Sequence, residues 1–193
     1  MRTKEFEPDN IADAAMRVFW QRGYAATSIQ DLVEGTGLSR SSLYSTFESK
    51  QGLYQCALHR YSAVTTANVE LLSGSGSPQT LIRKLLTSVV EDELNDPQHR
   101  GCLAANATLE LAGQDEAVAE WAAHNFQRLH KALEKLIRRG QQTGEIAPEK
   151  NSRALASFFV STMQGMRVLS KGTTLAQRRQ RLMDVANVAL DTL

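Results

Sequence analysis

The sequence predicts an all-α protein in which a small N-terminal unit of three helices precedes a larger helical bundle. Apolar residues recur at helical spacing along most of the 193 residues, and no β-rich run interrupts them. Glycine-containing turns separate the first helices. Each proline stands at the edge of a periodic stretch, where it would delimit a helix rather than break one: Pro8, Pro78, Pro97 and Pro148.

Composition excludes several classes of protein. The chain has 22 Lys and Arg against 21 Asp and Glu, a formal net charge of +1, so it does not coat nucleic acid or membrane by charge alone. The longest apolar stretch without charge, residues 154–166, is shorter than the roughly 20 residues that cross a bilayer. No signal peptide is recognisable, and two cysteines, Cys56 and Cys102, imply no disulfide framework. We expect a cytoplasmic protein without membrane contact.

Four helices are expected in the N-terminal third. The first begins at Pro8 and ends at Gly23. The T-x-x-Q pattern of residues 27–30 is a capping box that would start the second helix, and the glycines of residues 35–37 end it. Ser39 and Ser49 are suitable N-caps for the third and fourth helices.

The Ser/Gly-rich segment 73–78 is the clearest break in composition and is expected to be a flexible loop. Beyond it, helices are predicted over residues 79–95, 102–111, 115–139, 152–170 and 175–191. Gly140 is expected to begin the break after the long helix. The chain is therefore expected to divide into two domains, residues 1–50 and residues 51–193.

Two short helices joined by a glycine-containing turn form the helix-turn-helix pattern, whose second helix enters the DNA major groove. At about 100° per residue, Leu43 and Phe47 mark the inward face of that second helix. The remaining face offers short hydroxyls, Arg40 and Tyr44, with no acidic residue before Glu48. Such residues suit contact with phosphates and base edges, although a packing unit with a solvated serine-rich face would show the same helices.

Charge within this unit is local. The first 60 residues hold equal numbers of basic and acidic side chains, but residues 39–60 contain Arg40, Lys50 and Arg60 against Glu48 alone. Lys50 stands beside a helix N-terminus, where free backbone N–H groups also attract anions. These cations are therefore predicted to meet the DNA backbone.

The runs TSIQDLV and GLSRSSLYSTFESK within residues 27–50 resemble the TetR (tetracycline-repressor-like) family of bacterial regulators. The likeness is specific over about residues 11–58. It implies a homodimeric regulator, most often a repressor that leaves a palindromic operator when a small molecule binds, with no cofactor. It also implies phosphate contacts from Thr27, Ser28 and Lys50. The reading surface would consist of Ser39, Arg40, Ser41, Ser42, Tyr44 and Ser45.

One departure from the family pattern concerns DNA contact. Thr46 stands immediately before Phe47, where the family usually has His or Tyr, so a phosphate contact from Thr46 would be shorter or absent. Thr36 and Leu38 stand where Ala and Val are usual in the turn, which is a variation in packing.

The last two predicted helices offer the best dimerisation surface, since two such helices from each protomer would form a four-helix interface. The alternative is ordinary intrachain core. The candidate contacts are Leu155, Phe158, Met166, Leu182, Val185, Ala186 and Ala189.

A ligand cavity is expected among the middle helices. Its candidate apolar walls are Trp121, Phe126, Phe159 and Met163, and its candidate polar anchors are Asn106, Glu110 and His124, all of which are alternatively plain core or surface residues. Cys102 stands at a helix start near basic residues, a setting that activates a thiol, so it is either a sensor of oxidants or electrophiles or a small buried residue.

The sequence gives little support to an enzymatic function. Neither a complete G-x-G-x-x-G nor a G-x-S-x-G motif is present, and the histidines make no pair at metal-ligand spacing. We therefore expect no catalytic residues and no metal. A helical interaction module without DNA binding is the remaining alternative; the set Arg40, Tyr44 and Lys50 disfavours it.

Overall fold

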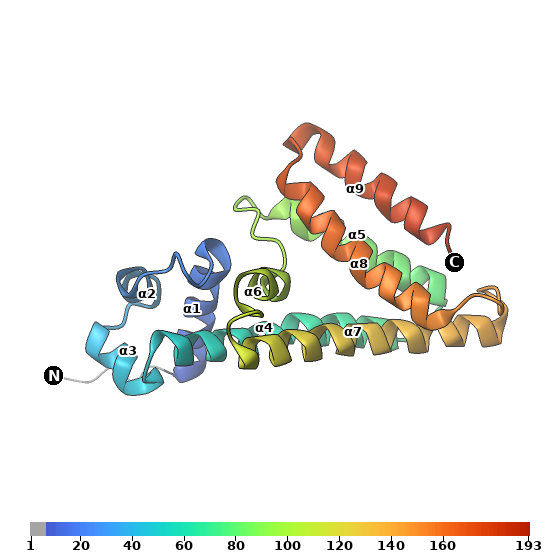
Figure 1. Cartoon of the computed structure of the whole chain (residues 1–193). Coiled ribbons are helices and arrows are strands. Elements are labelled where there is room, and N and C mark those ends of the chain that lie inside the picture. Colours follow the sequence, from blue (N-terminus) through green and yellow to red (C-terminus); the bar gives the residue numbers. More distant parts are fainter. Residues whose placement is uncertain (1–6) are drawn as a thin grey trace. The chain divides into compact units, whose positions relative to one another are not determined.

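A computed structural model describes residues 7–193, and every regular element in that part of the chain is a helix (Figure 1). The predicted all-α class is thereby confirmed. The helices are α1 (Pro8–Arg22), α2 (Ile29–Thr36), α3 (Arg40–Phe47), α4 (Lys50–Ser73), α5 (Pro78–Asn95), α6 (Leu103–Leu111), α7 (Glu116–Thr143), α8 (Ser152–Lys171) and α9 (Leu175–Leu190). No helix in the described residues is long and apolar enough to cross a membrane.

The chain forms two compact units, each built from two separate stretches of the sequence. The first unit comprises the described residues up to Ala63 together with residues 103–122, and the second comprises residues 64–102 and 123–193. This division differs from the expected boundary after residue 50. The reason is that α6 and the start of α7 pack with the N-terminal helices, a long-range association that local periodicity does not reveal.

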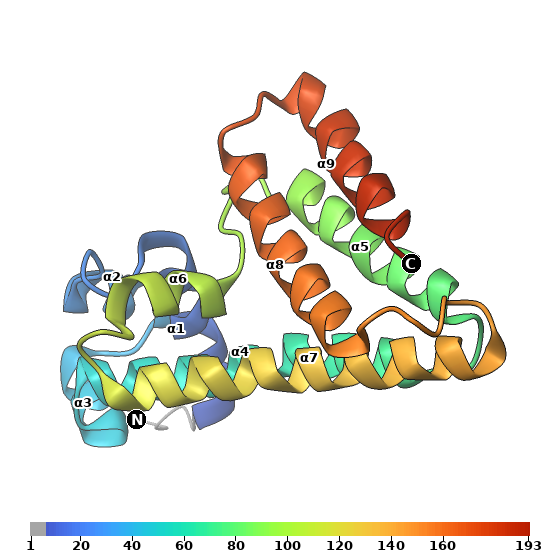
Figure 2. The ribbon, with the colours of Figure 1, turned by 45° about the vertical axis from the view of Figure 1, so that its right-hand side comes forward.

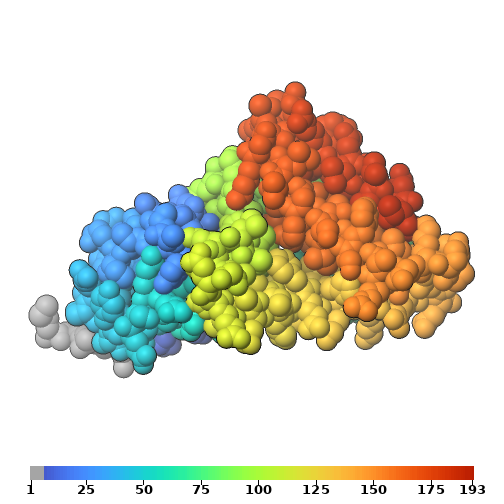
Figure 3. Space-filling view, viewed as in Figure 1, coloured from blue at the N-terminus to red at the C-terminus, as the bar shows by residue number. Residues whose placement is uncertain are grey.

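An aromatic cluster forms the centre of the first unit. Phe19 and Tyr54 are almost fully buried, and their ring centroids lie 4.8 Å apart in an edge-on arrangement. The Tyr24 ring lies 4.8 Å from that of Tyr54. In the space-filling view, residues of α6, in yellow-green, lie against the blue N-terminal helices (Figure 3). This core supports α2 and α3.

In the second unit, α5, α8 and α9 pack side by side (Figure 2). Their apolar faces join those of α4 and α7 in one cluster of buried side chains, which includes Leu85, Val89, Leu133, Phe159 and Leu182. Burial of such side chains from water is the principal source of stability for a helical bundle.

Helix α7 continues through Gly140 to Thr143, so the expected break at Gly140 is wrong. The glycine serves a close approach instead. A Cβ at this position would lie only 2.6 Å from Cδ1 of Ile146, and the amides of Glu145 and Ile146 both donate hydrogen bonds to the Gly140 carbonyl oxygen. The returning chain therefore packs on the last turn of the helix.

Candidate DNA-binding surface

The start of α2 is fixed one residue later than the T-x-x-Q pattern predicts. The Ser28 hydroxyl accepts a hydrogen bond from the Asp31 amide, and the Asp31 carboxylate accepts one from the Ser28 amide, which is a capping box. Hydrogen bonds from Ser28 hold the pKa of Asp31 below its usual value. Thr27 is buried, and its hydroxyl donates to the Gly23 carbonyl oxygen. Its side chain is thus occupied within the protein, contrary to the expected phosphate contact.

A tight turn joins α2 to α3. Gly37 has φ of 71°, a left-handed conformation that favours glycine, and its N–H donates to the Val33 carbonyl oxygen. Ser39 then caps α3 by accepting a hydrogen bond from the Ser42 amide at 3.1 Å. Buried Leu43 and Phe47 anchor α3. The local sequence thus produces the expected helix–turn–helix.

The opposite face of α3 meets water. Its exposed residues are Arg40, Ser41, Tyr44, Ser45 and Thr46, with Ser42 half-buried and the cap Ser39 exposed beside them. The Arg40 guanidinium carbon lies 5.8 Å from the centroid of the Tyr44 ring. The Ser39 hydroxyl oxygen lies 2.9 Å from those of Ser41 and Ser42. The exposed face of α3 therefore combines two long side chains with a cluster of short hydroxyls, and α3 itself carries no carboxylate.

Lys50, the first residue of α4, is half-buried. Its Nζ lies 4.4 Å from the centroid of the Tyr24 ring, and burial lowers the pKa of Lys50 against the opposing effect of the Glu110 and Asp31 carboxylates. Its ammonium group thus has a defined position at a helix N-terminus. Arg60 differs from the expectation, because it forms ion pairs with Asp13 at 2.8 Å and Asp9 at 3.2 Å.

Glu110 occupies a role that sequence reasoning missed. Its carboxylate on α6 accepts hydrogen bonds from the backbone amides of Tyr24 at 2.8 Å and Ala25 at 2.6 Å, in the turn between α1 and α2. It is therefore a tether of this turn rather than the expected anchor in a ligand cavity. Tyr24 and Glu110 are 86 residues apart in the sequence, so no local pattern could have revealed this hydrogen bond.

The other expected ligand contacts are dispersed. Trp121 belongs to the first unit, where its indole N–H donates to the Ser62 hydroxyl at 3.1 Å, and half-buried Asn106 lies there too. In the second unit, His124 is exposed, which disagrees with its expected role as a polar anchor in a ligand cavity. The remaining candidates there are half-buried Phe126 and core-buried Phe159 and Met163.

Cys102 is buried, with 8% of its surface exposed, directly before α6. Its neighbour Gly101 has φ of 68°, and a Cβ there would lie 3.1 Å from Cε of Lys171. The structure thus brings the lysine side chain beside the segment that holds Cys102.

The expected dimerisation residues divide by burial. Phe158 is exposed, and Leu155 and Val185 are half-buried. Four others belong to the core of the protomer, where a partner would not reach them, namely Met166, Leu182, Ala186 and Ala189. This corrects the expectation for those four, which helical spacing alone did not distinguish from outward-facing residues.

Comparison with known proteins decides the family. Residues 11–56 match the model of "Bacterial regulatory proteins, tetR family", and residues 80–186 match "Tetracyclin repressor-like, C-terminal domain". The chain is 30% identical over 192 residues to the transcriptional repressor ComR of Escherichia coli (strain K12), covering 98% of this chain and 90% of ComR. The chain belongs to the tetR family of bacterial regulatory proteins. It is therefore a regulator of transcription rather than an enzyme, with an N-terminal helix-turn-helix for DNA.

Solved structures of tetR-family proteins share the fold. A cysteine mutant of CifR, complexed with 26-base-pair operator DNA, superposes with a TM-score of 0.85 at 30% identity, covering 98% of both chains. A regulator from Chloroflexus aurantiacus J-10-FL superposes with a TM-score of 0.84 at 23% identity, covering 95% of this chain and 92% of that one. An uncharacterised regulator of Bacillus subtilis (strain 168), YezE, is 30% identical over 193 residues, covering 98% of this chain and 99% of YezE.

Proposed function

We propose that the protein is a homodimeric repressor in the cytoplasm that binds a palindromic operator through α3 and leaves it when a small molecule binds the second unit. The observation that carries this proposal is the exposed face of α3, which offers an arginine, a tyrosine and hydroxyls on a helix anchored by Leu43 and Phe47. The CifR complex with operator DNA and the name of ComR as a repressor support it.

The proposed contacts divide by chemistry. Arg40 is suited to donate two hydrogen bonds to a guanine edge, and Tyr44 and the serines are suited to phosphates and nearby bases. Ser28 and Lys50 would meet phosphate at two helix N-termini, whereas the amide and the hydroxyl of Thr27 both donate within the protein and would make no such contact. The short side chain of Thr46 limits its reach.

Arg40→Ala should weaken operator binding by about 1–3 kcal/mol and relax the base preference at one position, because a bidentate contact is lost. Lys50→Ala should weaken binding to all sequences and reduce the salt slope by about one unit. Gel shifts on selected and scrambled DNA at several salt concentrations measure both. Arg83→Ala, which removes an exposed arginine of α5, is the control. Unchanged binding by the first two variants would show that α3 is not the recognition helix.

For the dimer, we propose the outward faces of α8 and α9. On α8, Phe158 and Val168 are exposed, and Ser161 and Gly165 lie between them on the same face. On α9, Val188 is 66% exposed. Large apolar side chains beside small ones allow helices of two protomers to approach closely, and half-buried Leu155 and Val185 would pack at the margins.

Gly165→Phe should convert the dimer to a monomer and abolish stable operator binding. A Cβ added at Gly165 meets no atom of another segment within 4 Å, so the new side chain would extend into open space and push a partner helix away. Gly113→Phe is a matched control, since a Cβ there also meets nothing within 4 Å, in the turn after α6. Light scattering after size exclusion measures the mass, and a dimeric Gly165→Phe variant would refute the interface.

For the inducer, we propose an oxidant or electrophile that reacts with Cys102. The position of Cys102 before α6 and the nearness of the Lys171 chain to Gly101 support this proposal. Diamide should release the parent protein from its operator but leave Cys102→Ser bound, as gel shifts would show. Cys56→Ser is the control for the other thiol. Equal release of the parent and Cys102→Ser would eliminate Cys102 as the sensor.

A further inference from the structure

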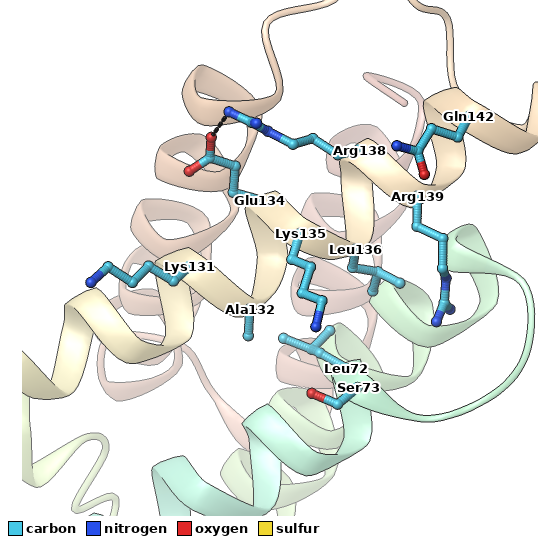
Figure 4. A pocket seen from close by; sticks show the side chains of 10 residues that line it. All are labelled: Leu72, Ser73, Lys131, Ala132, Glu134, Lys135, Leu136, Arg138, Arg139 and Gln142. Carbon is cyan, nitrogen blue, oxygen red and sulfur yellow. Dashed lines mark hydrogen bonds and ion pairs between the residues drawn. The ribbon is translucent and has the colours of Figure 1, made fainter.

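A basic groove lies in the second unit between the C-terminal end of α4 and the side of α7. Its volume is about 710 Å³, within the usual range for small-molecule sites. Figure 4 shows the side chain of Lys135 extending from α7 toward Leu72 and Ser73 of α4, with Arg139 on the same side of α7. The groove contains none of the residues proposed above for DNA, inducer or partner contact.

The charges that line the groove are unbalanced. Four cationic side chains line it, Lys131, Lys135, Arg138 and Arg139, against the single carboxylate of Glu134. Arg138 forms an ion pair with that carboxylate, with an N–O distance of 2.6 Å. No carboxylate within residues 7–193 forms an ion pair with Lys131, Lys135 or Arg139. The groove therefore holds positive charge that the described chain does not neutralise.

One wall of the groove is held in place by the protein itself. The Arg139 guanidinium donates to the carbonyl oxygens of Gly74 at 3.1 Å and Gly76 at 2.8 Å, which ties the loop after α4 to α7. The Ser73 hydroxyl donates to the Val69 carbonyl oxygen at 2.7 Å, so its lone pairs remain as acceptors. Arg139 is thus held between α7 and this loop, whereas Lys131 and Lys135 are exposed on α7.

The groove also has an apolar component. Leu72 and Leu136 line it but are almost fully buried, so its accessible apolar surface comes from half-buried Ala132 and the methylene stems of the lysines. A purely ionic partner would leave this surface uncovered, whereas an apolar body would cover it.

We propose that this groove binds a small organic anion that carries at least two negative charges on an apolar body. The charges would pair with Lys131, Lys135 and the edge of the Arg139 guanidinium, and the body would lie over Ala132 and the methylene stems of the lysines. The site is independent of α3 and Cys102, so its test does not depend on the proposed repressor function.

The test uses bis-ANS, a dye that carries two sulfonates on an apolar ring system and fluoresces when bound. Lys131→Glu/Lys135→Glu should raise its Kd by about tenfold or more, because two attractive charges become repulsive. The control Arg83→Glu/Lys84→Glu reverses two exposed cations of α5 outside the groove and should leave the Kd within about twofold. Dodecanedioate should displace the dye from the parent protein, and dodecanediol, which has the same chain without charge, should not.

Four results would overturn the proposal. An unchanged Kd in the groove variant, or an equal rise in the control, would show that the dye does not use these cations. Equal displacement by the diol and the dicarboxylate would show a merely apolar site. If the groove variant, without added ligand, loses as much operator affinity as dye affinity, the cations would be assigned to DNA binding.

Discussion

Glu93→Ala should destabilise the second unit by about 3–5 kcal/mol, because it removes the buried carboxylate that faces the Arg167 guanidinium. Glu93 and Arg167 are both buried, with 2% and 9% of their side chains exposed, and Arg167 donates to Oε1 of Glu93 at 3.0 Å. Removing the carboxylate leaves the guanidinium buried beside Asp92, which is 59% exposed and lies at 3.3 Å. Water compensates such a buried charge poorly.

The neighbouring pair on the same helix gives a matched control. Glu91 pairs with Arg179 at 3.0 Å, but these side chains are 44% and 61% exposed, so Glu91→Ala should cost no more than about 1 kcal/mol. Urea unfolding followed by circular dichroism measures both variants. Replacing both buried partners, as in Glu93→Leu/Arg167→Met, should cost less than Glu93→Ala because the buried guanidinium is removed together with the carboxylate. Equal losses from Glu93→Ala and Glu91→Ala would refute this account of the buried pair.

Glu110→Ala should lower operator affinity by about tenfold, equivalent to 1.4 kcal/mol. The substitution removes two short hydrogen bonds to a charged acceptor, and these bonds hold the turn that leads into α2. The turn would then sample other orientations, and binding DNA would require it to be ordered again. Arg40 and the α3 serines remain unchanged, so base preference should persist while affinity falls at all sites.

Hydrogen exchange separates this local effect from general unfolding. The amides of Tyr24 and Ala25 should exchange faster in Glu110→Ala, while amides in the middle of α5 should not change. Glu110→Gln retains one acceptor oxygen and should show an intermediate affinity. Glu120→Ala, at an exposed position of α7 in the same unit, is the control. Unchanged exchange at Tyr24 and Ala25 would show that the carboxylate does not hold the turn.

The helix–turn–helix could be predicted from the sequence because its determinants are close together along the chain. Ser39 caps α3 by bonding to an amide three residues away, Gly37 supplies the left-handed turn, and Leu43 and Phe47 share a face through helical spacing. The same local information placed Arg40, Tyr44 and the serines on the exposed side. The all-α class and the family resemblance depend on this kind of pattern too.

Local patterns also allowed more than one outcome. Helix α7 continues through Gly140, on which Ile146 packs, and the Thr27 hydroxyl donates to Gly23 while Ser28 caps α2. Met166 and Leu182 have the spacing of an interface stripe but face the core of their own protomer. Periodicity gives the angle between side chains on one helix, not which neighbour each face meets.

The sequence by itself therefore determined the helices, the exposed face of α3 and the family, since each depends on residues within a few turns of one another. Only the tertiary structure decided that Glu110 tethers the turn before α2 and that Glu93 pairs with Arg167. It also decided that four cations of α7 line a groove beside α4. Hydrogen bonds, ion pairs and grooves of this kind join segments far apart in the chain, and their partners are set by packing.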